Sequence, residues 1–207
     1  YAEPDSESIR EDVADGVAAG RVVIVSLHWG DEFATRPSHD QVNLGRDLVD
    51  RGARMIIGHH PHVLQGWERR GDGVILYSLG NFVSDICWNT PVRRTAIAEV
   101  RLDRDGVDDV ALHPVVIDDD FAPRLADGKE AREIAAFLAK ERRWLETRPQ
   151  PWGPRTDRAY AWRLRRALYR YRVQKYMFTL ARFRRMSPDH RSDIVKRFVK
   201  SRLPRRD

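Results

Sequence analysis

The stretches Arg21–His28, RVVIVSLH, and Arg54–His62, RMIIGHHPH, decide what fold this chain can adopt. Each is an apolar, β-branched run of strand length that ends in histidine. Between them, a loop closed by Pro37-Ser38 leads into a helix that begins at about His39 and ends at Gly52, a good C-terminal cap. A strand–helix–strand order makes the two strands parallel neighbours, so their carboxyl ends lie side by side. We therefore expect the histidines of the two stretches to meet, although they are far apart in the sequence.

Four of the seven histidines of the chain lie in these strand ends: His28, His59, His60 and His62. Neutral imidazole is the commonest protein ligand for metals such as zinc, manganese and iron, and α/β sheets gather their ligands at strand ends. The sequence predicts a metal site formed by His28, His60 and His62, with His59 as the alternative if the register is shifted by one. Taken singly, each of them could also be an ordinary surface or core histidine.

Three motifs follow one another along the chain: HWGDE at 28–32, GHHPHV at 58–63 and YSLGNF at 77–82. In this order they resemble the CapA family, the poly-γ-glutamate capsule biosynthesis proteins, which is similar to the calcineurin-like metallophosphoesterases. The resemblance covers about residues 1–117. It implies a two-sheet sandwich flanked by helices, two divalent metal ions (Mn, Fe or Zn) and metal-dependent hydrolysis of a phosphoester by the complete protein.

Calcineurin-like enzymes hold their two metals with an early Asp-x-His, a bridging Asp, an Asn-His, a later single His and a final His-x-His. The resemblance matches His28 to the single His, and His60 and His62 to the His-x-His. The sequence contains no Asp-x-His and no Asn-His, and it begins with Tyr1. We therefore expect this chain to be the C-terminal part of the family domain, with the N-terminal half left out, and to be inactive alone.

Glu32, His59 and Asn81 are the candidates for substrate contacts or for support of the metal ligands. Glu32 occupies the glutamate position of the HWG-x-E motif, but it could equally be an ordinary loop carboxylate. Asn81 could hydrogen-bond the ligand loops, as groups behind metal ligands commonly do. A plain tight turn at Gly80-Asn81 explains the same residues equally well.

The composition is that of a highly charged globular protein, with 42% hydrophobic and 33% charged residues. The longest apolar run, 22–27, is far shorter than the ~20 residues of a membrane span, and the single cysteine, Cys87, excludes an internal disulfide. Charge is unevenly distributed: residues 140–207 have 22 Lys and Arg against 6 Asp and Glu, a net charge of +16, whereas residues 1–139 have a net charge of −10. This asymmetry indicates an anionic partner for the C-terminal part. The alternative is a helix surface that is merely solvated.

The second half of the chain predicts hairpins at 63–78 and 95–117, a helix at 129–146, and one long or two broken helices over 158–186. The apolar residues of the last segment fall on two sides of a helix, which predicts that the tail packs partly against protein. We expect an α+β fold with two domains: residues 1–128, part of a metallophosphoesterase-like sandwich, and residues 129–207, an Arg-rich helical extension.

Three functions remain open from the sequence. The first is a metal-dependent hydrolase of capsule or cell-envelope polymer biosynthesis, acting on a phosphoester or an anionic polymer. The second is a non-catalytic, membrane-associated component of a polymer synthesis or export assembly, whose basic tail docks on an anionic membrane surface. Nucleic-acid binding by the tail ranks last, because no recognition motif accompanies its charge. The expected location is the bacterial cell envelope or its membrane.

Overall fold

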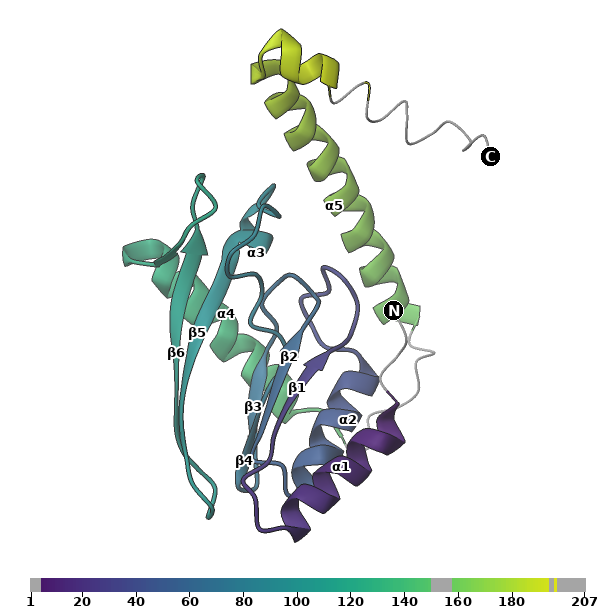
Figure 1. Cartoon of the computed structure of the whole chain (residues 1–207), viewed down its shortest axis with the longest axis vertical. Helices are drawn as coiled ribbons and strands as arrows, with labels where there is room; N and C mark the ends of the chain where they lie inside the picture. The colour runs from purple at the N-terminus through teal and green to yellow at the C-terminus, as the bar shows by residue number, and fades with distance from the viewer. Residues whose placement is uncertain (1–4, 150–157, 194–195, 197–207) are drawn as a thin grey trace. The chain divides into compact units, whose positions relative to one another are not determined.

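The computed structural model describes residues 5–149, 158–193 and 196. The chain divides into two compact units, residues 1–168 and 169–207. The first unit contains two β-sheets with helices around them, as Figure 1 shows. This confirms the expected α+β class and its two-sheet arrangement. None of the helices in the described segments is long and apolar enough to cross a membrane.

The first sheet has the strand order β1-β2-β4-β3. Its strands are β1 (Ile24–His28), β2 (Met55–His59), β3 (Trp67–Arg70) and β4 (Gly73–Leu76). Strands β1 and β2 are parallel, as are β2 and β4, and β3 pairs with β4 as the predicted hairpin. The parallel neighbours that the sequence predicted are therefore confirmed.

Helix α1 (Ser6–Ala18) precedes the first sheet, and α2 (His39–Asp50) is the helix that the sequence predicts between β1 and β2. Ser38 caps α2 in a capping box: its hydroxyl accepts from the Gln41 N–H, while the Gln41 side chain accepts from the Ser38 N–H. At the other end, Gly52 adopts a φ of 106°, a conformation open to glycine, and turns the chain toward β2. Together these signals fix the length of the crossover between β1 and β2.

The second sheet is antiparallel, with the order β5-β6-β7. It contains β5 (Arg94–Leu102), β6 (Val107–Ile117) and β7 (Pro123–Leu125), and the short helix α3 (Thr90–Arg93) leads into β5. The predicted hairpin at 95–117 is therefore present as β5 and β6.

The two sheets and three helices enclose separate apolar clusters. One cluster joins α1 and α2 to the first sheet through Val13, Leu48, Ile56 and Ile75. Another lies between the sheets, where Met55, Val74 and Leu76 meet apolar residues of β5 and β6. Helix α4 (Gly128–Glu146) buries Ile134 and Leu138 against a third cluster, beside the second sheet. The result is a sandwich with helices outside it.

The apolar run 21–27 predicts an interior strand and, where this chain does not supply both of its neighbours, an exposed apolar sheet edge. The structure shows the exposed edge and not the strand buried on both faces. Strand β1 begins only at Ile24 and lies at the edge of its sheet, with β2 as its single neighbour within the described part of the chain. Ile24 is 51% exposed and Val22 37% exposed. An edge position explains this exposure, because among the residues that the structure describes only β2 pairs with β1.

Helix α5 (Arg158–Arg185) is a single helix of 28 residues. The two-domain boundary at 128/129 remains a prediction, since α4 packs on the strands of the first unit and the two compact units divide at Leu168.

Candidate functional site

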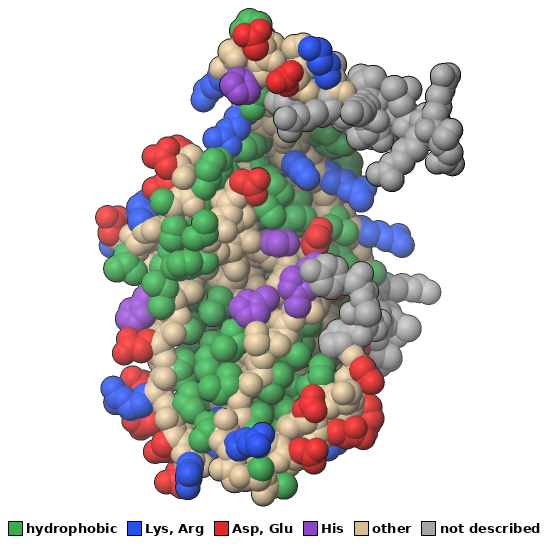
Figure 2. All heavy atoms as spheres, in the orientation of Figure 1, with side chains coloured by type: hydrophobic (Ala, Val, Ile, Leu, Met, Phe, Trp, Pro, Cys, Tyr) green, Lys and Arg blue, Asp and Glu red, His purple; other side chains and the backbone are tan. Residues whose placement is uncertain are grey.

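The parallel ladder of β1 and β2 carries the histidines to one place. His28 and His59 are partners in the register and are the last residues of their strands. The His28 and His60 rings have their centroids 4.6 Å apart, and the His60 and His62 rings 5.9 Å apart. Histidine side chains gather near the centre of the face shown in Figure 2. The structure therefore brings the predicted ligands together; their role as metal ligands stays a prediction.

Gly58 allows β2 to pass close beneath this cluster. A Cβ atom at residue 58 would lie 2.0 Å from the Tyr77 carbonyl oxygen and 2.3 Å from Trp29 Nε1. Those two groups are themselves joined, because Trp29 Nε1–H donates to the Tyr77 carbonyl over 2.9 Å. Trp29 thus has a packing and anchoring role, and the glycine of the GHHPHV motif is explained by close approach of backbone and indole.

The loops around the cluster hold unusual backbone conformations. His60 has a φ of 98° and His62 a φ of 59°, and Phe33 in the facing loop has a φ of 62°. Such conformations cost non-glycine residues about 1–3 kcal/mol each and cluster at functional sites. The Phe33 N–H donates to the Pro61 carbonyl over 2.8 Å, which ties the two loops to each other. The strain therefore lies in the segments that present the histidines.

Asn81 fixes the orientation of His62. Its Oδ1 lies 2.9 Å from His62 Nδ1, and its Nδ2 donates to the Val92 carbonyl over 3.2 Å. Because Nδ2 is the donor to Val92, Oδ1 is the acceptor toward His62, so Nδ1 carries the proton. The lone pair of His62 then lies on Nε2, the arrangement found in histidines that bind metals. Gly80 beside it adopts a φ of 81°, a conformation that favours glycine.

Burial and neighbouring charge favour the neutral form of two of the rings. Burial, followed by the charge of His28, lowers the pKa of His59 and that of His60. Glu32 and Asp31 act in the opposite direction on the pKa of His60, so both carboxylates lie within electrostatic reach of its ring. A lowered pKa favours the neutral imidazole, which is the form that binds metals.

The donor chemistry of the cluster fits a transition metal, but the described residues do not form a complete coordination shell. Within residues 5–149, 158–193 and 196, no group of three or more His, Cys, Asp or Glu side chains is arranged to hold a metal ion. The Asp31 carboxylate accepts a hydrogen bond of 2.7 Å from the Tyr160 hydroxyl. The histidines thus supply neutral, partly oriented nitrogen donors, and further ligands would be needed to close a site.

Sequence reasoning missed two buried glutamines below the loop that follows β1. Gln41 Nε2 donates to Gln65 Oε1 over 3.2 Å, and Gln65 Nε2 donates to the Ala34 carbonyl over 2.8 Å. Both side chains are almost fully buried. Gln41 also belongs to the capping box of α2, so the helix start and the loop are held by one set of hydrogen bonds.

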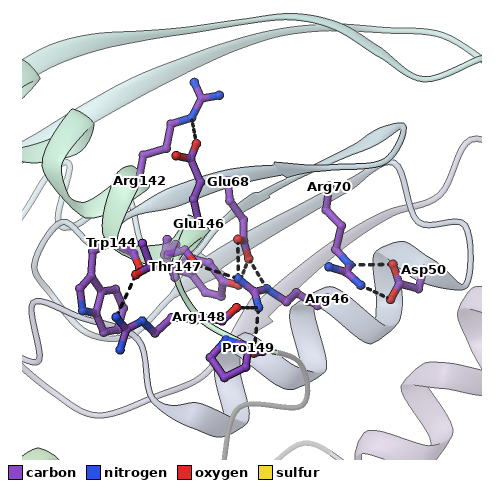
Figure 3. A network of polar contacts seen from close by, with 12 residues as sticks. Arg46, Asp50, Glu68, Arg70, Arg142, Trp144, Glu146, Thr147, Arg148 and Pro149 are labelled. Atoms are coloured by element: carbon purple, nitrogen blue, oxygen red, sulfur yellow. Dashed lines mark hydrogen bonds and ion pairs between the residues drawn. The ribbon is translucent and has the colours of Figure 1, made fainter.

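Sequence reasoning also missed a buried ionic network behind the first sheet, shown in Figure 3. Arg46 makes two hydrogen bonds of 2.8 Å to Glu68, and the Tyr77 hydroxyl donates to the same carboxylate over 2.6 Å. Arg46 also donates to the Leu145 and Arg148 carbonyls at the end of α4. The Glu68 hydrogen bond raises the pKa of Arg46, and burial raises the pKa of Tyr77. A signal was present, since Arg46 shares a helix face with Val42 and Val49.

Comparison with known proteins shows which proteins the site-bearing part of the chain resembles. Residues 1–86 match the family model of the bacterial capsule synthesis protein PGA_cap. The capsule biosynthesis protein CapA of Bacillus anthracis is 35% identical over 120 residues, which cover 58% of this chain and 29% of that protein. The PGA biosynthesis protein CapA of Bacillus subtilis is 38% identical over 121 residues, covering 58% of this chain and 32% of that protein.

A probable polyglutamine synthesis accessory protein of Mycobacterium tuberculosis is 34% identical over 84 residues, covering 37% of this chain and 22% of that protein. The chain spans about a third of the length of the two Bacillus relatives. The resemblance seen in the three sequence motifs is confirmed by these matches. Over the part of its length that they cover, the chain is similar to the bacterial capsule and PGA biosynthesis proteins CapA.

Proposed function

We propose that this chain carries part of a metal-dependent, phosphoester-hydrolysing site in a bacterial protein of capsule or cell-envelope polymer biosynthesis. The observation that carries the proposal is the juxtaposition of the His28, His60 and His62 rings at the carboxyl ends of parallel strands. The names of the relatives support the biosynthetic context. The strained backbone of His60 and His62 supports a functional rather than a structural role for the loop.

Each residue of the cluster has a separate task in this proposal. His28, His60 and His62 are nitrogen ligands, and Asn81 holds His62 in the tautomer that presents Nε2. Glu32 and His59 lie at the margin, where they would orient substrate or a ligand. Two divalent ions of Mn, Fe or Zn, when bound, would activate a water molecule and neutralise charge on the phosphoryl oxygens. The ligands still required correspond to the Asp-x-His and Asn-His motifs, which this sequence does not contain.

Metal uptake by the 207-residue chain tests the ligand assignment without an activity assay. Co²⁺ or Zn²⁺ binding is measured by absorption spectroscopy and calorimetry for the parent and for His28→Gln, His60→Gln and His62→Gln. We expect each substitution to weaken binding, and Asn81→Ala to weaken it by about 10–100-fold through loss of orientation. His113→Gln is the matched control, because His113 is an exposed histidine that pairs with Glu99 on the second sheet. Parent-like binding by the His28 or His62 variant would contradict the assignment.

A second candidate is a non-catalytic component of an anionic-polymer assembly. The absence of a ready group of three ligands among the described residues favours it, because the cluster could then have a structural task. Turnover of an aryl phosphate with added manganese, by a protein as long as the Bacillus relatives, separates the two candidates. Turnover that is lost in His60→Gln supports hydrolysis, whereas metal binding without turnover supports the non-catalytic role.

A further inference from the structure

Helix α5 carries a row of exposed apolar side chains along one face. Tyr169, Val173, Tyr176 and Leu180 are separated by four, three and four residues, a spacing that places them on a single helical face. Met177 adjoins the row, and Trp162 extends it by two turns toward the N-terminus. The exposed fractions of these six residues range from 43% to 71%. This set, called the α5 stripe below, is unusual in extent for a helix surface in water.

The opposite side of the same helix is covered. Tyr171 is only 7% exposed, and burial raises its pKa to about 12. Tyr171 therefore differs from the six residues of the α5 stripe, each of which is at least 43% exposed.

The stripe runs through a strongly cationic helix. Between Arg158 and Arg185 the sequence has ten Lys and Arg and no Asp or Glu. Helical geometry places Arg165 and Arg172 on one side of the stripe and Arg166 and Arg170 on the other. The Arg166 guanidinium also lies 5.3 Å from the centre of the Trp162 ring. Although α5 has apolar residues on two sides, this side combines aromatic and aliphatic side chains with flanking arginines, the residue types that contact acyl chains and headgroups at a membrane interface.

We propose that α5 binds the surface of an anionic lipid bilayer, with the α5 stripe inserted among the acyl chains and its flanking arginines at the headgroups. Charge complementarity identifies an anionic partner, since the helix contains no carboxylate of its own. The stripe selects lipid over a soluble polyanion, because a soluble polymer of carboxylates has no apolar layer to receive Trp, Tyr and Leu side chains. This inference does not depend on the metal site.

Co-sedimentation of the 207-residue chain with vesicles tests the proposal. We expect binding to phosphatidylcholine vesicles that contain phosphatidylglycerol, and none to pure phosphatidylcholine. The variant Tyr169→Gln/Tyr176→Gln/Leu180→Gln keeps the charge and a good helix former at each position, and should bind at least about tenfold more weakly. The variant Arg165→Gln/Arg172→Gln should lose about fivefold per arginine and become less sensitive to salt.

The matched control is Ala161→Gln/Thr179→Gln, which changes two exposed residues off the stripe and should bind like the parent. Circular dichroism of each variant establishes that α5 remains helical. Binding to neither type of vesicle, or equal binding to both, would overturn the proposal. So would parent-like binding by the stripe variant, since contact would then be through charge alone. Soluble poly-γ-glutamate that binds the parent and stripe variant equally, in the absence of vesicle binding, would assign the helix to an acidic polymer instead.

Discussion

Arginine has different tasks in the two halves of this molecule. Around the sheets, arginines are paired with carboxylates, and Arg46 does so in almost complete burial between Glu68 and the end of α4. Along α5, ten basic residues occur without a single acidic residue in the helix. The charges around the sheets are therefore part of the packing, whereas those of α5 are presented outward. The net charge of +6 for the whole chain is therefore the sum of an ion-paired region and a strongly cationic one.

The largest effect on stability is expected at Arg46. The substitution Arg46→Met removes one partner of a buried pair and leaves the Glu68 carboxylate uncompensated, which costs about 3–5 kcal/mol. Urea denaturation gives the free energy of unfolding. The matched control is Arg70→Met, because Arg70 makes the same two-bond pair with Asp50 at an exposed site and is expected to cost under about 1 kcal/mol. Equal losses for the two variants would show that burial is not what distinguishes these arginines.

The next effect concerns the close packing beneath the histidines. Gly58→Ala places a methyl group against the Tyr77 carbonyl and the Trp29 indole, neither of which can retreat without opening the sheet. We expect a loss of about 3 kcal/mol, measured as a lower Tm and urea midpoint. Gly71→Ala is the control: its φ of 50° carries strain, but nothing lies within 4 Å of the added atom, so about 1 kcal/mol is expected. A loss of stability by Gly58→Ala no larger than that of Gly71→Ala would mean that β2 is less closely packed against Tyr77 and Trp29 than the structure shows.

The sequence was sufficient for the features that depend on local signals. Ser38 and Gly52 mark the ends of α2, and the strand–helix–strand order placed His28 beside His60. It was not sufficient where the outcome depends on distant partners. The burial of Arg46 requires Glu68 and the carbonyls of α4, and no local pattern specifies that meeting.

The edge position of β1 also depends on more than the local sequence. An apolar run predicts burial, but the number of neighbouring strands is a property of the whole sheet. The positive φ values of His60 and His62 were also beyond reach, because histidine seldom adopts them and only the surrounding contacts impose them. The candidate site was thus predictable in its members but not in its backbone.

A smaller effect is expected on the pH dependence of stability, which should differ between the sheet region and helix α5. Helix α5 contains no histidine, and arginine does not titrate near neutrality, so histidine-linked stability changes are expected from the sheet region. His59 and His60 have folded-state pKa values below the ordinary 6.5, so the unfolded chain binds more protons as pH falls. Their contribution to stability is therefore complete above about pH 6.5 and is lost as pH decreases toward the folded-state pKa values.

Thermal unfolding of metal-free protein between pH 8 and pH 5 measures this contribution (the range is about that over which histidine titrates). The variant His59→Gln/His60→Gln should lose less stability than the parent over that range. A loss of stability that both proteins share over this pH range is attributed to the protonation of carboxylates. Parallel curves for the two proteins would show that burial of these rings is not coupled to their protonation.

The smallest effect on stability is expected at the edge of the first sheet. Ile24 is 51% exposed on β1, which lies at the edge of the first sheet. An unpaired apolar edge favours strand pairing between molecules, and a lysine there opposes it. Ile24→Lys should therefore reduce self-association in light scattering while changing the free energy of unfolding by under about 0.5 kcal/mol. Val83→Lys, at a 75% exposed loop residue, should leave association unchanged. If self-association instead persists in Ile24→Lys and falls in Tyr176→Gln, helix α5 and not the edge of the first sheet is the surface through which the molecules associate.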